Sequence, residues 1–399
     1  MTAISTFTKN QKRCFSILVY FIIPLAGMNT DIYLPSLPAM SVHFHVTKTL
    51  VQLTVTTYLV AMGIGQLIAG PISDALGRKK LLLIAILSQI IATLAILFSP
   101  SIYWILCFRF IQGAGAAFMM VPARAVINDI FSGPELKKKI NSITMVFAIG
   151  PIVSPFIGGY LQHYFGWQAN FIFVLIYAVI LLMFLCILYQ ETIIKTHPLL
   201  LKDLWKNYQL ILSHKHFLLS GLFASFMLGY FALFGVVGPF MVQVVLHKNA
   251  VVYGHIALLL GLAWFLGNTL NRLLFRYDSK TKTQFALWFI VIAVLILLMF
   301  AQLGLFNLIS LTIPIFIMIL FSALMFSIYV SECMVIFTDL SASANGCLFS
   351  MTWIIFSGYT TLATLLKAHS LFPLSITYLG VILVSLLFYY IFVRKLKLV

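Results

Sequence analysis

The chain has 399 residues, of which 62% are hydrophobic and only 9% are charged, and its formal net charge is +16. A soluble domain could not solvate so much apolar surface, so the composition excludes a soluble globular protein. The basic residues lie in short segments between apolar stretches, so we interpret the net charge as a membrane-topology signal and expect no nucleic-acid partner. The expected surrounding is a lipid bilayer.

Twelve apolar stretches are long enough to cross a bilayer, because about 20 helical residues span the hydrocarbon core. Helices are expected because open backbone is not tolerated in lipid. The sequence therefore predicts an all-α membrane protein with twelve transmembrane helices. In chain order we expect the spans at 14–37, 50–72, 80–98, 102–127, 140–160, 169–189, 217–241, 251–273, 284–304, 307–330, 345–366 and 371–393.

The distribution of basic residues predicts an orientation. Almost all of them fall on one side of the bundle, and the opposite side holds only Lys48, Lys248 and Lys367. Cytoplasmic loops carry an excess of Lys and Arg in membrane proteins, so we expect both termini to be cytoplasmic.

The spans fall into two sets of six. The longest polar connection follows the sixth span, and the seventh span begins the second set. A weak internal repeat supports this division, because Gly267 and Asn271 after the eighth span are spaced like Gly70 and Asp74 after the second. We therefore predict an N-terminal six-helix half at 1–189, a cytoplasmic linker at 190–216 and a C-terminal six-helix half at 217–399.

Two charged residues lie deep within predicted spans, Asp31 in the first and Arg109 in the fourth. A charge in a transmembrane helix costs on the order of 3 kcal/mol, so it is normally paired or functional. At a helical rise of about 1.5 Å per residue, both residues lie roughly 10 Å below the same membrane surface. We expect Asp31 to carry a proton and Arg109 to tune it. The alternative is a static ion pair that fixes helix packing.

Further residues are candidates for a cavity that binds substrate. Polar residues near the depth of Asp31 add hydrogen-bonding capacity, and the second half offers apolar and aromatic side chains that suit amphipathic molecules. For each aromatic residue, packing between helices or against lipid is the open alternative. The candidates are Asn29, Tyr33, Tyr58, Gln112, Met119, Phe226, Tyr230 and Phe234.

The segment 70–80, GPISDALGRKK, lies between the second and third spans and follows the pattern G-x-x-x-D-x-x-G-R-K. Its two glycines, Gly70 and Gly77, permit close backbone approach and a tight reversal of the chain.

The charged residues of this segment predict a contact between helix ends. Asp74 and Arg78 can pair with each other or with Asp129 at the end of the fourth span. Such a cluster would act as a cytoplasmic latch that forms in one conformation and breaks in the other. The alternative is topological: the basic residues hold the loop inside, and Asp74 helps to cap a helix.

The fifth span contains GPIVSPFIGGYL, in which glycines permit close helix contact and prolines bend the helix. We expect a kinked packing face built from Gly150, Pro151, Pro155, Gly158 and Gly159.

These motifs resemble those of the major facilitator superfamily. In addition to the loop pattern, RFIQGAGAA in the fourth span resembles the arginine-bearing motif of proton-coupled facilitators. The motif of the fifth span resembles that of drug:proton antiporters. TDIYLPSLPAM in the first span and PARAVINDIF at 122–131 resemble the Bcr/CflA branch. The chain departs from that branch at Asn128 and Gln168, where a basic residue is usual.

The resemblance implies a pseudo-symmetric transporter that works by alternating access. It implies proton-coupled export of lipophilic or amphipathic small molecules through a bacterial-type inner membrane. It also implies that the transporter is a monomer and that the fifth span is the hinge between the halves. One alternative is a dedicated carrier of one natural metabolite, such as a siderophore or an amino-acid derivative. The remote alternative is a membrane sensor or enzyme. We find no catalytic constellation and no metal-ligand spacing, so we expect no enzymatic activity, no metal and no cofactor.

Overall fold

The computed structural model describes residues 7–193, 201–337, 340–366 and 369–396, and its regular elements there are all helical. Eleven helical segments in the described residues are long and apolar enough to cross a membrane. A further helix of 33 residues, α6 (Gly133–Phe165), takes the place of the fifth predicted span. Each of the twelve predicted spans is therefore helical.

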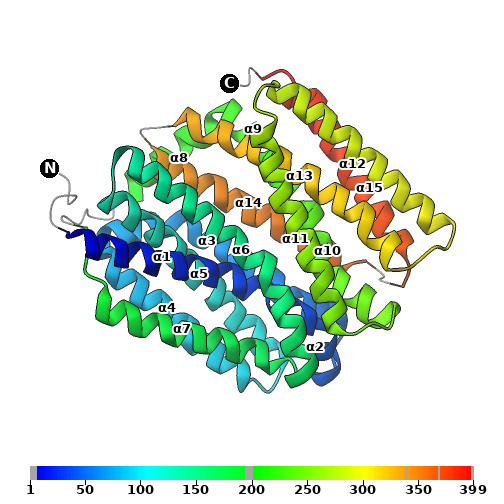
Figure 1. Cartoon of the computed structure of the whole chain (residues 1–399), viewed down its shortest axis with the longest axis horizontal. Coiled ribbons are helices and arrows are strands. Elements are labelled where there is room, and N and C mark those ends of the chain that lie inside the picture. Colours follow the sequence, from blue (N-terminus) through cyan, green and yellow to red (C-terminus); the bar gives the residue numbers. More distant parts are fainter. Residues whose placement is uncertain (1–6, 194–200, 338–339, 367–368, 397–399) are drawn as a thin grey trace.

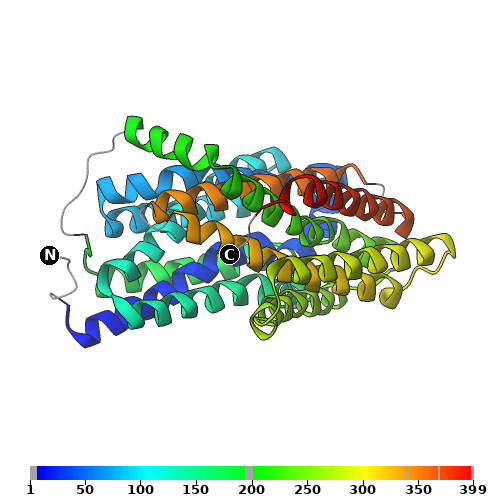
Figure 2. The same cartoon turned by 90° about the horizontal axis from the view of Figure 1, so that it is seen from above.

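The helices form two sets that lie side by side (Figures 1 and 2). The first half consists of α1 (Lys9–Asp31), a 3₁₀ turn (Leu34–Ser36), α2 (Leu37–His43), α3 (Lys48–Leu76), α4 (Arg78–Leu97), α5 (Ile102–Ile130), α6 and α7 (Gln168–Leu188). The second half consists of α9 (Lys215–Met227), α10 (Gly229–Phe240), a π-helical turn (Met241–Val245), α11 (Ala250–Leu273), α12 (Ser279–Gln302), α13 (Leu308–Ile336), α14 (Ser341–Thr364), α15 (Leu371–Phe388) and a last π-helical turn (Tyr389–Val393).

Several helix starts are fixed by side chains that accept hydrogen bonds from free backbone N–H groups. Thr8 and Gln11 form a reciprocal cap at the start of α1, and Asn307 and Ser310 do the same for α13. These caps fix where the two helices begin.

The first span is interrupted, which the sequence analysis did not predict. The helix α1 ends at Asp31, and a short turn leads into α2. The segment LPSLP explains the break, because Pro35 and Pro38 lack the N–H groups that would continue the helix. The span reaches His43 instead of the predicted residue 37, and Asp31 lies at the break.

The predicted linker contains a helix of its own, α8 (Leu201–Ser213). Its Ile211 packs in an apolar cluster of the second half, and the Tyr208 hydroxyl donates a hydrogen bond to the Leu67 carbonyl of α3 in the first half. The linker helix thus contacts both halves.

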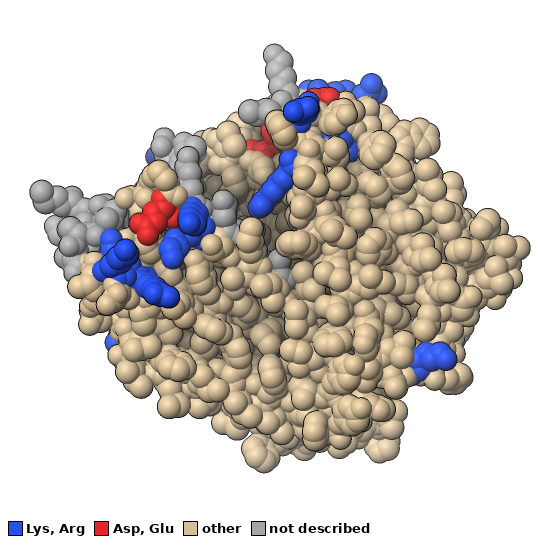
Figure 3. All heavy atoms as spheres, in the orientation of Figure 1, with Lys and Arg blue, Asp and Glu red and all other residues tan. Residues whose placement is uncertain are grey.

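The two halves meet along α3 and α14 and along α6 and α11. Side-chain hydrogen bonds join them far from the basic residues of the loops: Lys48 Nζ lies 2.8 Å from the Leu366 carbonyl, and the Thr56 and Thr360 hydroxyls lie 2.8 Å apart. We call the end that carries Lys12, Arg78 and Arg276 the basic end; Figure 3 shows the surface hollowed there between the charged clusters.

Two glycines of α6 allow helices to approach closely. A Cβ atom on Gly158 would lie 1.7 Å from the Ile32 carbonyl oxygen, and one on Gly159 would lie 2.7 Å from the carbonyl oxygen of Ala250 in the other half. The facing helix α11 also has a glycine at the contact, Gly254, which lies against the Pro155 carbonyl. The packing of α6 therefore has no room for a side chain at Gly158.

We expect Gly158→Ala to destabilise the protein by about 1–3 kcal/mol, because the Ile32 backbone must shift to admit the new methyl group. The measurement is the thermal unfolding midpoint in detergent. The matched control is Gly358→Ala in α14, where a Cβ would meet nothing within 4 Å and alanine favours the helix by up to about 1 kcal/mol. Equal midpoints for the two variants would contradict the proposed close contact.

Candidate functional site

Arg109 lies at the centre of a polar cluster inside the first half. Its side chain is fully buried, with 0% exposure. One guanidinium nitrogen, Nη1, donates to the Asn29 carbonyl at 2.9 Å and to Gln112 Oε1 at 2.8 Å, and Nε donates to the Thr54 carbonyl at 3.4 Å. The other terminal nitrogen, Nη2, has no hydrogen-bond partner among the described residues.

Two tyrosine rings complete the surroundings of this guanidinium. Its central carbon lies 4.5 Å from the ring centroid of Tyr33 and 4.3 Å from that of Tyr58. Stacking on aromatic faces is a favourable way to bury arginine. The Tyr33 hydroxyl pairs with that of Thr54 at 3.0 Å, and the Tyr58 hydroxyl donates to the Ala26 carbonyl at 2.8 Å.

A second layer of side chains, mostly amides, holds the residues that contact Arg109 in place. Asn29 Nδ2 donates to Gln89 Oε1 at 2.9 Å, and the Gln89 amide donates in turn to the Gln112 carbonyl. Gln112 Nε2 donates to the Thr93 hydroxyl at 2.8 Å. Gln89 and Thr93 were missed by the sequence analysis, although two polar residues four apart in an apolar span share one helix face and could have signalled them.

Asp31 does not join this cluster. No hydrogen bond or ion pair connects its carboxylate to Arg109 or to any other described residue, although the side chain is only 7% exposed. It lines a small pocket between the halves, where it faces Phe231, Phe234 and Tyr253 of the second half. The shared depth of Asp31 and Arg109 therefore does not place them in contact, because the two side chains leave their helices toward different neighbours.

The remaining cavity candidates separate into different environments. Phe234 lines the pocket beside Asp31, whereas Tyr230 is fully buried and stacks on Tyr378 at 6.0 Å between ring centroids. Phe226 packs edge to face with Phe388, and Met119 is fully buried. Phe234 is thus a second-half candidate that lines one pocket together with Asp31 of the first half.

The predicted latch residues meet at the basic end. Arg78 Nη1 lies 2.5 Å from Asp74 Oδ1, and Arg78 Nε lies 3.2 Å from Asp129 Oδ2. These contacts join α3, α4 and α5 within the first half. Whether they break during transport stays a prediction.

The start of the linker is also part of this cluster. The Glu191 carboxylate accepts hydrogen bonds from the backbone N–H groups of Arg78 and Lys79, at 3.0 and 2.9 Å, and so caps the start of α4. The Thr192 hydroxyl donates to Asp129 Oδ2 at 3.1 Å. Glu191 and Thr192 carried no sequence signal, because the contact depends on how the linker folds back.

The two glycines of the loop differ in their roles. Gly77 is the turn itself: its φ of +92° favours glycine, and a Cβ there would lie 2.6 Å from the Glu191 carboxylate. Gly70 lies within α3, and a Cβ there would meet only Val121 at 3.9 Å, an ordinary contact. The prediction that Gly70 serves close approach was therefore wrong for this structure, because the helix continues through it to Leu76.

Comparison with known proteins agrees with this architecture. The family model of the Major Facilitator Superfamily matches residues 19–357, so the chain belongs to this superfamily. The members of this superfamily are multi-pass membrane transporters, the class of protein that the motifs predicted.

Several curated relatives indicate the branch of the superfamily to which the chain is similar. The chain is 35% identical to the uncharacterized MFS-type transporter YdgK of Bacillus subtilis over 47% of each chain. It is 37% identical to a chloramphenicol resistance protein of Pseudomonas aeruginosa over 37% of this chain and 36% of that one. It is 31% identical to a bicyclomycin resistance protein homolog of Haemophilus influenzae over 51% of this chain and 52% of that one. The chain thus spans about half or less of the length of these relatives, of which the two resistance proteins are of the Bcr/CflA type.

Solved structures share the fold at low identity. A D-xylose-proton symporter superposes with a TM-score of 0.76 at 14% identity, over 95% of this chain and 97% of that one. A bacterial homolog of the human lysosomal transporter Spinster, in an inward-facing conformation, gives 0.75 at 14% identity, over 97% and 98%. Both support the two-half fold.

We expect Arg109→Lys to destabilise the protein by at least about 2 kcal/mol, because an ammonium group cannot reproduce both the divergent hydrogen bonds and the stacking on two rings. Thermal unfolding in detergent measures the loss. The control is Arg276→Lys, at an exposed position of the second half, which should leave the midpoint unchanged. A midpoint like that of the wild type would show that the cluster does not depend on the guanidinium.

Proposed function

We propose that this chain is a proton-coupled exporter of lipophilic or amphipathic small molecules that works by drug:proton antiport. The observation that carries the proposal is the position of Asp31, a buried carboxylate without a partner among the described residues, on the pocket between the halves. An isolated carboxylate is costly to bury, so it binds either a proton or a partner that offers positive charge or hydrogen-bond donors.

The surroundings of Asp31 suit a competition between proton and substrate. The pocket offers the rings of Phe234 and Tyr253, which bind apolar groups and cations, and the carboxylate offers the only charge in its lining. The pocket has a volume of about 10 Å³ in this structure, so a substrate would enter only after the halves separate around it. A substrate that enters would then displace the proton, and a proton would displace the substrate. Arg109 places a fixed positive charge in the same half, and a positive charge nearby favours release of the proton from Asp31.

We propose that the basic end faces the cytoplasm and that the structure is inward-facing. The excess of Lys and Arg at that end supports the orientation. The hydrogen bonds that join the halves at the other end, with the hollow at the basic end, support the conformation. Alternation would then rock the halves on the α3–α14 and α6–α11 contacts, with Pro151 and Pro155 as the bend in α6.

The names of the relatives guide the choice of substrate. Two of them are named for resistance to chloramphenicol and to bicyclomycin, which makes these compounds the first probes. Another relative, 26% identical over 47% of this chain and 36% of that one, is a citrate exporter of Aspergillus niger, which favours a dedicated metabolite carrier as the second candidate. Saturable transport of one metabolite without transport of either drug would favour this second function.

We expect Asp31→Asn to abolish proton-driven transport, because an amide cannot exchange a proton at this site. The measurement is uptake of chloramphenicol and bicyclomycin into proteoliposomes under an imposed pH gradient. Exchange of unlabelled for labelled drug without a gradient should survive, which separates coupling from folding. Full gradient-driven accumulation in the variant would refute the proton-carrier role.

The matched control for this experiment is Asp278→Asn. Asp278 lies outside the spans and caps α12, a role that asparagine also fills. Hydrogen bonds from Thr281 hold the pKa of the Asp278 carboxyl below its usual range, so it stays ionised through the assay. This variant should therefore retain both exchange and coupling.

We further propose that Asp74, Arg78 and Asp129 act as a latch at the basic end. Asp74→Asn should change the transport rate at least about fivefold, a typical size for a coupling between two states. The balance of states is read from thiol labelling of a cysteine introduced at Thr56, which is buried against Thr360 in the closed end. Glu135→Gln, an exposed acid at the same end, is the control. Unchanged rate and labelling would leave the cluster a purely topological role.

A further inference from the structure

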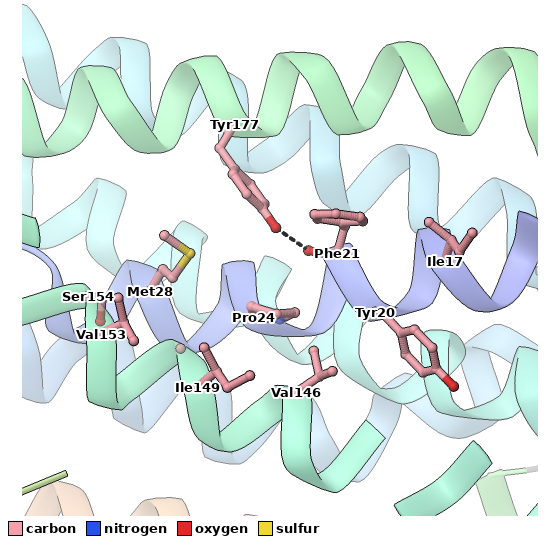
Figure 4. Close-up of a pocket in the computed structure, with 11 residues that line it drawn as sticks. Ile17, Tyr20, Phe21, Pro24, Met28, Val146, Ile149, Val153, Ser154 and Tyr177 are labelled. Carbon is pink, nitrogen blue, oxygen red and sulfur yellow. Dashed lines mark hydrogen bonds between the residues drawn. The ribbon is translucent and has the colours of Figure 1, made fainter. Parts of the chain in front are cut away.

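An apolar groove in the first half shares no lining residue with the pocket of Asp31. It has a volume of about 470 Å³ and is lined by α6 and α7, with α1 as its floor (Figure 4). In Figure 1 the helix α1 lies between α6 and α7. Its volume is in the range of about 300–1,000 Å³ that is typical of small-ligand sites.

The lining of the groove is suited to hydrocarbon and not to a polar ligand. Ile17, Phe21 and Ile149 are each about half exposed along it, at 45%, 52% and 53%. The backbone carbonyl of Phe21, beside the kink at Pro24, accepts a hydrogen bond of 2.9 Å from the Tyr177 hydroxyl (Figure 4). This bond occupies one backbone carbonyl of α1 that borders the groove.

The length of the groove matches one leaflet. Its floor runs from Ile17 to Met28 on α1, which corresponds to about 16 Å of helix. Half of the hydrocarbon core of a bilayer is about 15 Å thick. Because α1 begins at the basic end with Lys9, the groove spans the leaflet on that side. An acyl chain of that leaflet therefore has the length to fill it.

The mouth of the groove at the basic end is positively charged. Lys139 Nζ lies 5.8 Å from the ring centroid of Tyr20, which lines the groove, and 5.2 Å from that of Phe131. Arg13 is exposed one helical turn before Ile17 and so shares its face of α1. Glu135, one turn before Lys139 on α6, is the exposed acid nearby along the helix. Two cations beside an apolar channel complement a phosphate with an attached acyl chain.

We propose that this groove binds an anionic phospholipid of the leaflet at the basic end, with one acyl chain on the floor formed by α1 and the phosphate between Arg13 and Lys139. The floor and one wall also form the α1–α6 contact, where a Cβ atom on Gly150 would lie 3.1 Å from the Pro24 carbonyl oxygen. A bound lipid therefore stabilises the present arrangement of α1 and α6.

The test is titration of the full chain, delipidated in detergent, with dioleoylphosphatidylglycerol and separately with dioleoylphosphatidylcholine, with bound lipid counted by native mass spectrometry. The wild type should bind phosphatidylglycerol more tightly. Arg13→Gln and Lys139→Gln should each weaken that binding roughly fivefold, the effect of about 1 kcal/mol per basic residue near a membrane surface. Arg276→Gln, at an exposed position of the second half, should leave it unchanged.

A second variant tests the groove apart from the charges. Val153→Phe places a ring in the groove and leaves Arg13 and Lys139 intact, so it should reduce phosphatidylglycerol binding by a similar factor without lowering the unfolding midpoint of the lipid-free protein. Wild-type affinity in Val153→Phe would show binding by surface charge alone and overturn the proposal. Equal affinity of the wild type for the two lipids would overturn it as well.

Discussion

The burial of one guanidinium group inside the membrane is the constraint on which the first half depends. Arg109 on α5 lies there with two of its three guanidinium nitrogens hydrogen-bonded and with two tyrosine rings beside its charge. The partners come from several elements: α1 supplies the Asn29 carbonyl, the turn after α1 supplies Tyr33, α3 supplies Tyr58 and Thr54, and Gln89 of α4 holds the Asn29 side chain. Displacing any of these helices would remove hydrogen bonds or ring contacts that stabilise a charge in a medium of low dielectric constant. The cluster therefore holds α1, α3, α4 and α5 as one body, as a rocking mechanism requires of each half.

The second half meets this body with a different kind of interior. Most of its buried polar groups are neutral hydroxyls and rings, such as the Tyr230–Tyr378 stack and the hydrogen bond between Thr283 and Tyr329, and its buried acid, Glu332, lies near the end of α13. Asp31 lies where the two kinds of interior meet, next to the break that the LPSLP segment makes in the first span. The first half thus contributes the fixed charge of Arg109, and the second half contributes aromatic side chains to the pocket. The Asp31 carboxyl lies between them.

Much of this arrangement was predictable from the sequence. Bilayer thickness dictates helix length, so the spans followed from hydropathy, and depth along a helix correctly grouped Asn29, Tyr58 and Gln112 with Arg109. Depth says nothing about rotation around the helix axis, which is why the contact of Asp31 with the second half could not be derived. The contact of Glu191 with the start of α4 could not be predicted either, because the two partners are 112 residues or more apart in the sequence and meet only when the linker folds back.

The linker has a mechanical consequence. Its first residues hold the start of α4 through the Glu191 carboxylate, and its helix α8 packs with the second half through Ile211. The carboxylate thus attaches one end of a tether to the loop at Gly77, and the apolar cluster attaches the other end to the opposite half. Because both attachments lie on the same connection, any movement of the halves at the basic end changes the distance between the Glu191 carboxylate and the Ile211 side chain.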